Sequence, residues 1–191
     1  LKGVTSSGKT EIYINLIDET IAKGRQVLYL LPEIALTTQI IQRLQKYFGE
    51  KVGVYHSKYN ESERVEIWNK ANIPLSGNQE QQPFQILLGA RSALFLPYTD
   101  LGLIIVDEEH DSSYKQNDPA PRYNARDAAV VLGGIHKCPV LLGSATPSLE
   151  SYYNAQSGKY KLVELAERYG GVQMPEIKII DIKEEARMKR M

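Results

Sequence analysis

Short apolar runs alternate with amphipathic stretches along most of this chain. The nearly continuous apolar runs are typical of strands buried on both faces of a sheet, and they cover 26–31, 52–55, 84–88, 101–106 and 140–143. Apolar residues at helical spacing predict helices at about 11–23, 35–48, 60–71, 127–132 and 147–156. This alternation predicts right-handed βαβ units and a mostly parallel sheet in a three-layer α/β/α fold.

Local signals set the ends of several elements. Pro32 closes the strand at 26–31, and Asn60 or Ser62 caps the helix that follows 52–55. The pair Gly133-Gly134 is predicted to end the helix at 127–132. Pro147 is well placed at the first position of the last helix.

Polar connections interrupt this pattern at two places. Residues 72–83 contain Pro, Gly and many amides, which predicts a surface loop inside one domain. Residues 111–126 form a long loop that is rich in tyrosines and polar side chains. Two late strands are expected at 160–165 and 177–182, and they either pair with each other or extend the sheet edge.

The run at 101–106 ends in a cluster of ionisable residues. Asp107, Glu108, Glu109 and His110 follow it directly, so a buried strand delivers carboxylates to an edge of the sheet. A nucleoside triphosphatase needs an Asp that holds Mg²⁺ and a Glu that deprotonates water at such a place. An ordinary strand end followed by a solvated turn would give the same local pattern.

The start of the chain favours the catalytic interpretation. Residues 3–10 fit G-x-x-x-x-G-K-[ST] in full and precede a predicted helix, so the loop amides and the helix end face phosphate oxygens. Lys9 would reach the β and γ phosphates, and the Thr10 hydroxyl would ligate Mg²⁺. The expected nucleotide-binding residues are Gly3, Val4, Thr5, Ser6, Ser7, Gly8, Lys9 and Thr10.

Composition limits the remaining possibilities. The 191 residues carry 23 basic and 23 acidic side chains, so no global basic field indicates nucleic acid, although a local groove can still bind phosphates. The single cysteine, Cys138, excludes a disulfide or a cysteine-ligated zinc site within this sequence. No membrane-length apolar run and no signal peptide are visible, so a cytoplasmic location is expected. We expect 1–191 to be one ATP-binding domain that is cut from a longer protein at both ends.

The combined motifs resemble the first motor lobe of superfamily-two helicases, with Asp107–His110 similar to their D-E-x-H box. More narrowly, the chain resembles the primosomal protein N′ family of bacterial replication-restart helicases. The matching segments are spread from end to end, at 3–13, 31–39, 55–57, 89–97, 107–116, 121–127 and 143–151.

The resemblance implies a role for each motif. Lys9, with Gly8 and Thr10, binds phosphates and Mg²⁺, while Asp107 holds the metal through water and Glu108 is the general base. His110 senses the γ-phosphate or couples to Ser144, Ala145 and Thr146.

It also implies where DNA binds. Thr37, Thr38 and Arg91 would contact DNA phosphates, although helix capping by the threonines and a salt bridge from Arg91 are open alternatives. The loop at 111–126 resembles the family's aromatic-rich loop, whose side chains stack on bases and adjust the catalytic Glu. Its candidate DNA contacts are Tyr114, Lys115, Arg122 and Tyr123.

Two positions depart from the family pattern. Ser6 stands where Gly is usual, so a positive φ there would strain the phosphate loop. Ala90 replaces a usual Thr and removes one possible phosphate donor.

The implied activity of the parent protein is ATP-dependent 3′→5′ unwinding of DNA at stalled forks. The partners would be single-stranded and forked DNA, other primosome proteins and single-strand-binding protein, with no membrane. ATP and Mg²⁺ would be the cofactors, and zinc would be held only outside this segment. The alternatives are the motor lobe of another superfamily-two translocase, such as a restriction-enzyme subunit, and a DNA-binding module that nucleotide switches.

Overall fold

The computed structural model describes residues 1–33, 38–56, 59–75 and 83–171. Three parts of the sequence-based predictions lie outside these residues: Thr37, the strand expected at 177–182 and most of the surface loop at 72–83.

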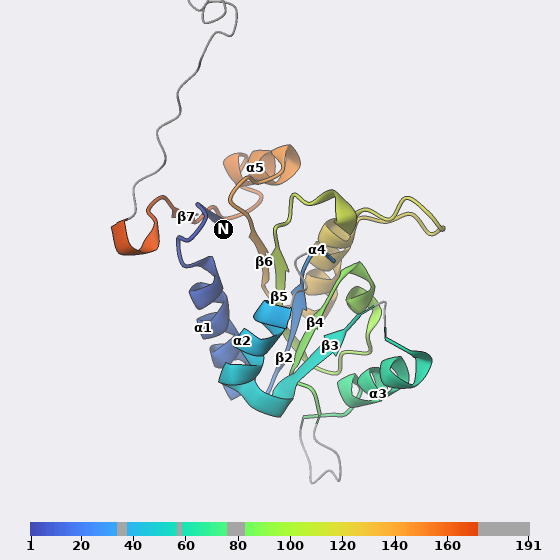
Figure 1. Ribbon diagram of the computed structural model, residues 1–191. Coiled ribbons are helices and arrows are strands. Elements are labelled where there is room, and N and C mark those ends of the chain that lie inside the picture. The colour runs from blue at the N-terminus through green and yellow to red at the C-terminus, as the bar shows by residue number, and fades with distance from the viewer. Residues whose placement is uncertain (34–37, 57–58, 76–82, 172–191) are drawn as a thin grey trace, which may run out of the picture.

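A five-stranded parallel sheet forms the centre of the fold (Figure 1). Its strand order is β3-β4-β2-β5-β6, and each neighbouring pair is parallel. The strands are β2 Gln26–Leu30, β3 Val52–Tyr55, β4 Ile86–Gly89, β5 Leu101–Asp107 and β6 Val140–Gly143. The parallel α/β prediction is confirmed, and the carboxyl ends of all these strands meet at one edge of the sheet.

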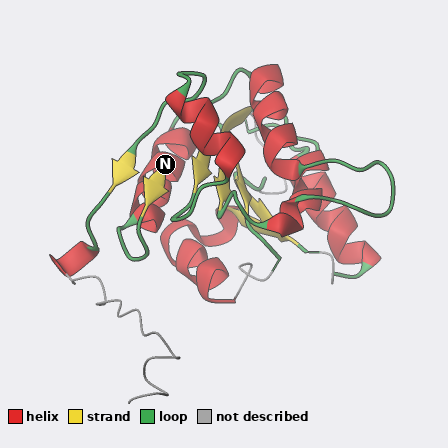
Figure 2. Cartoon of the chain, turned by 90° about the horizontal axis from the view of Figure 1, so that it is seen from above, coloured by secondary structure: helices red, strands yellow, loops and turns green. Residues whose placement is uncertain are grey.

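A second, two-stranded sheet continues this arrangement beyond β6. It pairs β1 (Lys2–Gly3) with β7 (Glu164–Leu165) in parallel, and the two strands lie side by side in Figure 2. Lys2 bridges to Ser144, and the Gly3 amide donates to the Ser144 carbonyl at 3.0 Å. The strand expected at 160–165 is therefore shorter than predicted, and it extends the sheet edge.

Helices cover both faces of the main sheet. Their bounds are α1 Lys9–Ala22, α2 Thr38–Phe48, α3 Glu61–Ala71, α4 Ala125–His136 and α5 Leu149–Gln156. Short 3₁₀ turns lie at Gly49–Lys51, Arg91–Phe95, Ser112–Tyr114 and Tyr169–Gly171. Of the two predicted caps for α3, Asn60 is the one observed, and it forms a reciprocal capping box with Glu63.

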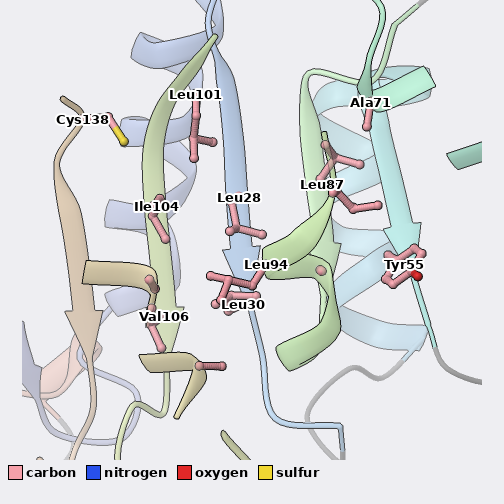
Figure 3. Close-up of a cluster of buried hydrophobic side chains, with 14 of the residues drawn as sticks. Leu28, Leu30, Tyr55, Ala71, Leu87, Leu94, Leu101, Ile104, Val106 and Cys138 are labelled. Carbon is pink, nitrogen blue, oxygen red and sulfur yellow. The ribbon is translucent and has the colours of Figure 1, made fainter. Parts of the chain in front are cut away.

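Two apolar clusters hold these layers together. The first joins α1 and α2 to one face of the sheet through residues such as Ile17, Leu44 and Ile105. The second lies on the other face, where Leu28, Leu87 and Ile104 pack beneath α3 and α4 (Figure 3). Full burial of one such side chain is worth about 1.5–3 kcal/mol. The two clusters therefore stabilise the sheet whose edge carries the motifs.

The predicted end of α4 at Gly133-Gly134 is wrong. The helix continues to His136, and Lys137 ends it in the left-handed conformation, with φ 51°. Gly133 serves close packing instead, because a Cβ there would lie 2.3 Å from Val140 Cγ2. The glycine lets the helix approach β6, which periodicity alone could not reveal.

Candidate nucleotide and metal site

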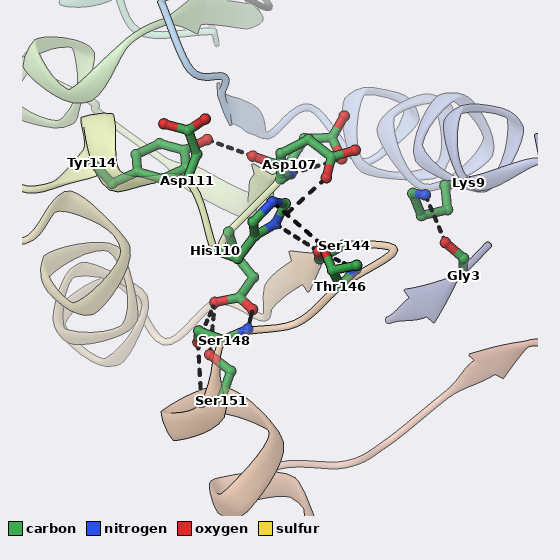
Figure 4. Close-up of polar contacts among 12 residues, drawn as sticks. Gly3, Lys9, Asp107, His110, Asp111, Tyr114, Ser144, Thr146, Ser148 and Ser151 are labelled. Atoms are coloured by element: carbon green, nitrogen blue, oxygen red, sulfur yellow. Dashed lines mark hydrogen bonds and ion pairs between the residues drawn. The ribbon is translucent and has the colours of Figure 1, made fainter. Parts of the chain in front are cut away.

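The phosphate-binding loop lies between β1 and α1. Ser6 and Gly8 both adopt left-handed backbone, with φ of 63° and 89°. Such a φ costs a residue with a Cβ about 1–2 kcal/mol, so the predicted strain at Ser6 is present. The Lys9 ammonium folds back on this loop and donates to the Gly3 carbonyl at 2.8 Å (Figure 4).

This loop fits a phosphate group. Ser7 Oγ is buried and, among the described residues, has no hydrogen-bond partner. A Cβ at Gly3 would lie 2.7 Å from that oxygen and 3.0 Å from Lys9 Cγ, so only glycine leaves room for both side chains. The first amides of α1 add the positive end of a helix dipole. A bound anion would give the Ser7 hydroxyl and the first amides of α1 a hydrogen-bond acceptor.

The acidic motif reaches the same edge of the sheet. Asp107 is the last residue of β5, and the Tyr13 hydroxyl of α1 donates to its Oδ1 at 3.0 Å. Since Tyr13 lies one helical turn after Thr10, this contact places Asp107 beside the start of α1. The structure therefore places Asp107 against the helix whose first turn carries Thr10, the other predicted metal-holding residue.

Glu108 faces the loop with unusual backbone geometry. Its φ is 46°, and its side chain is 38% exposed. Burial and the neighbouring Asp107 raise the pKa of Glu108, whereas the charges of Lys9 and His110 oppose this rise. A partly desolvated carboxylate has the greater basicity that proton abstraction from water requires.

His110 connects the acids to the segment after β6. Its Nδ1 lies 2.8 Å from Ser144 Oγ and 3.6 Å from Glu108 Oε2 (Figure 4). Its Nε2 is 3.4 Å from Thr146 Oγ1, and the Thr146 amide donates to Ser144 Oγ. Ala145 lies between these two hydroxyl residues and completes the connection. His110 is thus in side-chain contact with Ser144 and Thr146, two of its three predicted coupling partners.

Glu109 forms a buried centre that sequence reasoning missed. It is 2% exposed, and its Oε1 accepts the Ser148 amide at 2.7 Å. Its Oε2 accepts the Ser148 and Ser151 hydroxyls, at 3.0 and 2.8 Å, and the Arg126 guanidinium at 3.3 Å. The only signal in the sequence for this role was the position of Glu109 within the motif 107–110, whose other members were assigned chemical roles. Glu109 joins the acid turn to the end of the loop and to the start of α5.

Candidate DNA-binding residues

The predicted DNA contacts separate into buried and accessible groups. Tyr114 is 1% exposed, so the prediction that its ring stacks on a base is wrong for this structure. Its hydroxyl instead donates to the backbone carbonyls of Asp107 and Leu30, at 2.6 and 3.1 Å. The ring is therefore part of the core, and its hydroxyl holds the backbone at the end of β5.

Other members of the set are available to a ligand. Lys115 and Arg122 are exposed residues of the loop at 111–126, part of which projects beyond α4 in Figure 1, and Thr38 is exposed at the start of α2. Tyr123 is half-buried, with its ring 5.1 Å from that of Phe95 in an edge-to-face pair. The half-buried Arg91 donates to the Ser113 carbonyl at 3.1 Å, which is not the salt bridge considered from sequence.

Phe95 is a further candidate that the sequence analysis did not select. Its side chain is 57% exposed, and it forms with Tyr123 an aromatic pair at the surface. Exposed aromatic faces beside a guanidinium are the features that stack on unpaired bases.

Comparison with known proteins

The fold and the arrangement of the acids beside the phosphate loop define a P-loop helicase motor lobe. The family model described as DEAD/DEAH box helicase matches residues 1–155, and the chain belongs to this family.

Several relatives match nearly the whole of this chain. The chain is 46% identical over 187 residues to Replication restart protein PriA of Bacillus subtilis, which covers 98% of this chain and 22% of that protein. Identity to the protein of the same name is 49% over 185 residues in Rickettsia conorii, with 97% and 27% covered. In Chlamydia trachomatis it is 47% over 190 residues, with 100% and 24% covered. The predicted resemblance to replication-restart helicases is confirmed, and the chain spans about a quarter of these relatives' length.

A solved structure supports the fold independently. The structure described as RecG bound to a three-way DNA junction aligns over 100% of this chain and 24% of its own, with TM-score 0.64 and 20% sequence identity. At this identity the likeness concerns the fold alone.

In the part of the chain that the structure describes, no helix is long and apolar enough to cross a membrane. Those residues also contain no cluster of three or more His, Cys, Asp or Glu side chains suited to a metal ion.

Proposed function

We propose that this chain is the ATP-binding motor lobe of an ATP-dependent 3′→5′ DNA helicase that acts in replication restart. The observation that carries the proposal is the meeting of Lys9, Asp107 and Glu108 at one sheet edge, linked by the Tyr13–Asp107 contact. The similarity to restart proteins supports a biological setting at single-stranded and forked DNA, and the proposed location is the cytoplasm. Other primosome proteins and single-strand-binding protein are the proposed protein partners.

Each residue of the site has a defined task in this proposal. The loop amides and Lys9 bind the β and γ phosphates, and Thr10 and Asp107 hold Mg²⁺, with Asp107 acting through water. The metal, when bound, offsets negative charge on the phosphates. Glu108 orients a water molecule and accepts its proton, and the raised pKa of this carboxyl favours that transfer.

The contacts of His110 suggest how hydrolysis is communicated. The ring touches Ser144 and Thr146 on one side and approaches Glu108 on the other. A change at the phosphate or at Glu108 would therefore alter the segment that leads into α5. We assign DNA contact to the accessible set: Thr38, Arg91, Phe95, Lys115, Arg122 and Tyr123.

This lobe would depend on the rest of its parent protein. By family resemblance, a second motor lobe supplies an arginine that accelerates such reactions by about 10³–10⁵-fold. We therefore expect weak ATP binding and almost no DNA-stimulated hydrolysis from residues 1–191 alone. Zinc would belong to another part of the parent.

The test is ATP-driven unwinding of a forked substrate by the full-length protein, with Lys9→Ala as the inactive comparison. We expect unwinding with 3′→5′ polarity that Lys9→Ala abolishes, together with ATP turnover that DNA stimulates. Translocation on duplex DNA without fork unwinding would favour the restriction-type motor instead. ATP binding without turnover would favour the nucleotide-switched module, which the Glu108 geometry argues against.

A further inference from the structure

Two tyrosine hydroxyls converge on one carboxylate at the proposed metal site. Tyr13 of α1 donates to Asp107 Oδ1 at 3.0 Å, and Tyr29 of β2 donates to Oδ2 at 3.2 Å. The Glu108 amide donates to Oδ1 as well, at 3.1 Å. A carboxylate has about four acceptor positions, so these contacts define its orientation and leave room for another donor.

The two tyrosines are held rigidly. Both side chains are 0% exposed, and their rings pack edge to face with centroids 5.7 Å apart. Each hydroxyl reaches a different oxygen of the Asp107 carboxylate, so each acts as a hydrogen-bond donor to it. Fixed rings therefore present fixed hydrogen-bond donors to the acid.

A glycine on the neighbouring strand makes room for this arrangement. Gly143 ends β6 and pairs in register with Asp107. A Cβ at Gly143 would lie only 1.9 Å from the Tyr13 hydroxyl and 3.6 Å from Asp107 Oδ1. Three elements, α1, β2 and β6, are thus shaped around one carboxylate.

The donors are neutral, and that has a chemical consequence. Lys9, the nearest cation of the motif, donates to the Gly3 carbonyl. An ammonium or guanidinium on Asp107 would orient it but would also offset its charge and compete with a cation. Phenols orient the carboxylate and leave its full negative charge available to Mg²⁺.

We propose that Tyr13 and Tyr29 are positioning residues for magnesium, which hold the Asp107 carboxylate in the orientation that accepts metal-bound water. The inference rests on the proposed nucleotide site and assigns to that site two residues outside the phosphate loop and the acidic motif. It predicts that the hydroxyls affect the metal dependence of nucleotide binding more than the binding of nucleotide itself.

The test is a magnesium titration of fluorescent ADP (N-methylanthraniloyl-ADP) binding to the full-length protein. Tyr13→Phe and Tyr29→Phe should each raise the Mg²⁺ concentration for half-maximal binding by about tenfold to a hundredfold, because each removes a hydrogen bond to a charged group. Affinity for the same nucleotide in EDTA should stay unchanged.

Tyr98→Phe is the matched control, since it removes a tyrosine hydroxyl that donates to the Ala93 carbonyl at 2.7 Å and lies outside the site. It should leave the magnesium titration as in wild type. Equal Mg²⁺ dependence in wild type and both phenylalanine variants would overturn the inference. Failure of wild type to bind the nucleotide with or without Mg²⁺ would instead overturn the proposed nucleotide site.

Gly143→Ala provides a second route that keeps both hydroxyls in the protein. The added methyl group should displace the Tyr13 hydroxyl and raise the Mg²⁺ requirement to the same extent as Tyr13→Phe. In the Tyr13→Phe background, the same change should add little. Full additivity of the two shifts would show that Gly143 acts independently and would contradict the positioning role of Tyr13.

Discussion

Glu108 and Glu109 are neighbours in sequence but lie in opposite environments. Glu108 is half-exposed toward Lys9 and has few partners, whereas Glu109 is buried and accepts hydrogen bonds from Ser148, Ser151 and Arg126. The positive φ of Glu108 turns the chain, and the Glu109 amide then donates to the Gly143 carbonyl at 3.1 Å. The comparison teaches that one acid motif supplies both a reactive group and a structural anchor.

Replacing the reactive member should have the largest effect. Glu108→Gln keeps the shape but removes the proton acceptor, so kcat for ATP hydrolysis should fall by about 10²–10⁴-fold. Nucleotide affinity should remain close to wild type, because Lys9 and the loop bind the phosphates. Steady-state turnover and equilibrium binding of fluorescent ADP, both on the full-length protein, separate the two effects.

The exposed Glu150 offers a control for that experiment, since Glu150→Gln changes the same charge outside the site. It should leave kcat unchanged. A normal kcat in Glu108→Gln would remove this residue from the role of base and would make the two neighbouring carboxylates functionally alike.

Replacing the anchoring member should affect stability before chemistry. Glu109→Gln leaves the Arg126 guanidinium, which is 11% exposed, without its buried carboxylate partner. Losing one member of such a pair costs about 3–5 kcal/mol, and the remaining amide oxygen should limit the loss to the lower end. Thermal melting, together with faster hydrogen exchange in peptides covering 148–156, would detect it.

Glu150→Gln again serves as the matched control and should melt like wild type. If Glu109→Gln also melted like wild type but lost turnover as completely as Glu108→Gln, the division between reactive and anchoring acids would be wrong.

The sequence predicted the fold well because both strong signals are local. Continuous apolar runs locate β2 to β6, and helical spacing locates the helices that cover them. Gly133 was misinterpreted as a helix end because its role depends on Val140, which approaches it only in the folded chain. Close packing between elements leaves no mark on periodicity.

The site was predictable to the extent that motifs are contiguous. Each motif, at 3–10 and at 107–110, can be recognised within one short segment of sequence. The side chains that support these motifs come from other parts of the fold. Tyr13 and Tyr29 look like ordinary core residues in sequence, and Tyr114 looks like an exposed loop aromatic. Which hydroxyl meets which carbonyl or carboxylate depends on strand order, which periodicity does not determine.

The loop at 111–126 allows the same division to be tested at Tyr114, its buried root, and at its exposed basic side chains, Lys115 and Arg122. At the root, Tyr114→Phe keeps the buried ring but removes the hydroxyl that supports the Asp107 carbonyl. We expect stimulated kcat to fall by about threefold, as for a weakened hydrogen bond near the acids, with DNA affinity unchanged. On the exposed side of the loop, Lys115→Ala with Arg122→Ala should weaken DNA binding and leave stimulated kcat at saturation unchanged.

The salt dependence of single-stranded DNA binding measures the phosphate contacts of Lys115 and Arg122 most directly. Each lost phosphate contact lowers the slope of log affinity against log salt by about 0.7, so the double variant should lose about 1.4. Tyr114→Phe should keep the wild-type slope, because its hydroxyl is buried beneath the loop and meets backbone carbonyls. An unchanged slope in the double variant would place the DNA path away from Lys115 and Arg122. A reduced slope in Tyr114→Phe would mean that the loop rearranges to expose this tyrosine when DNA binds.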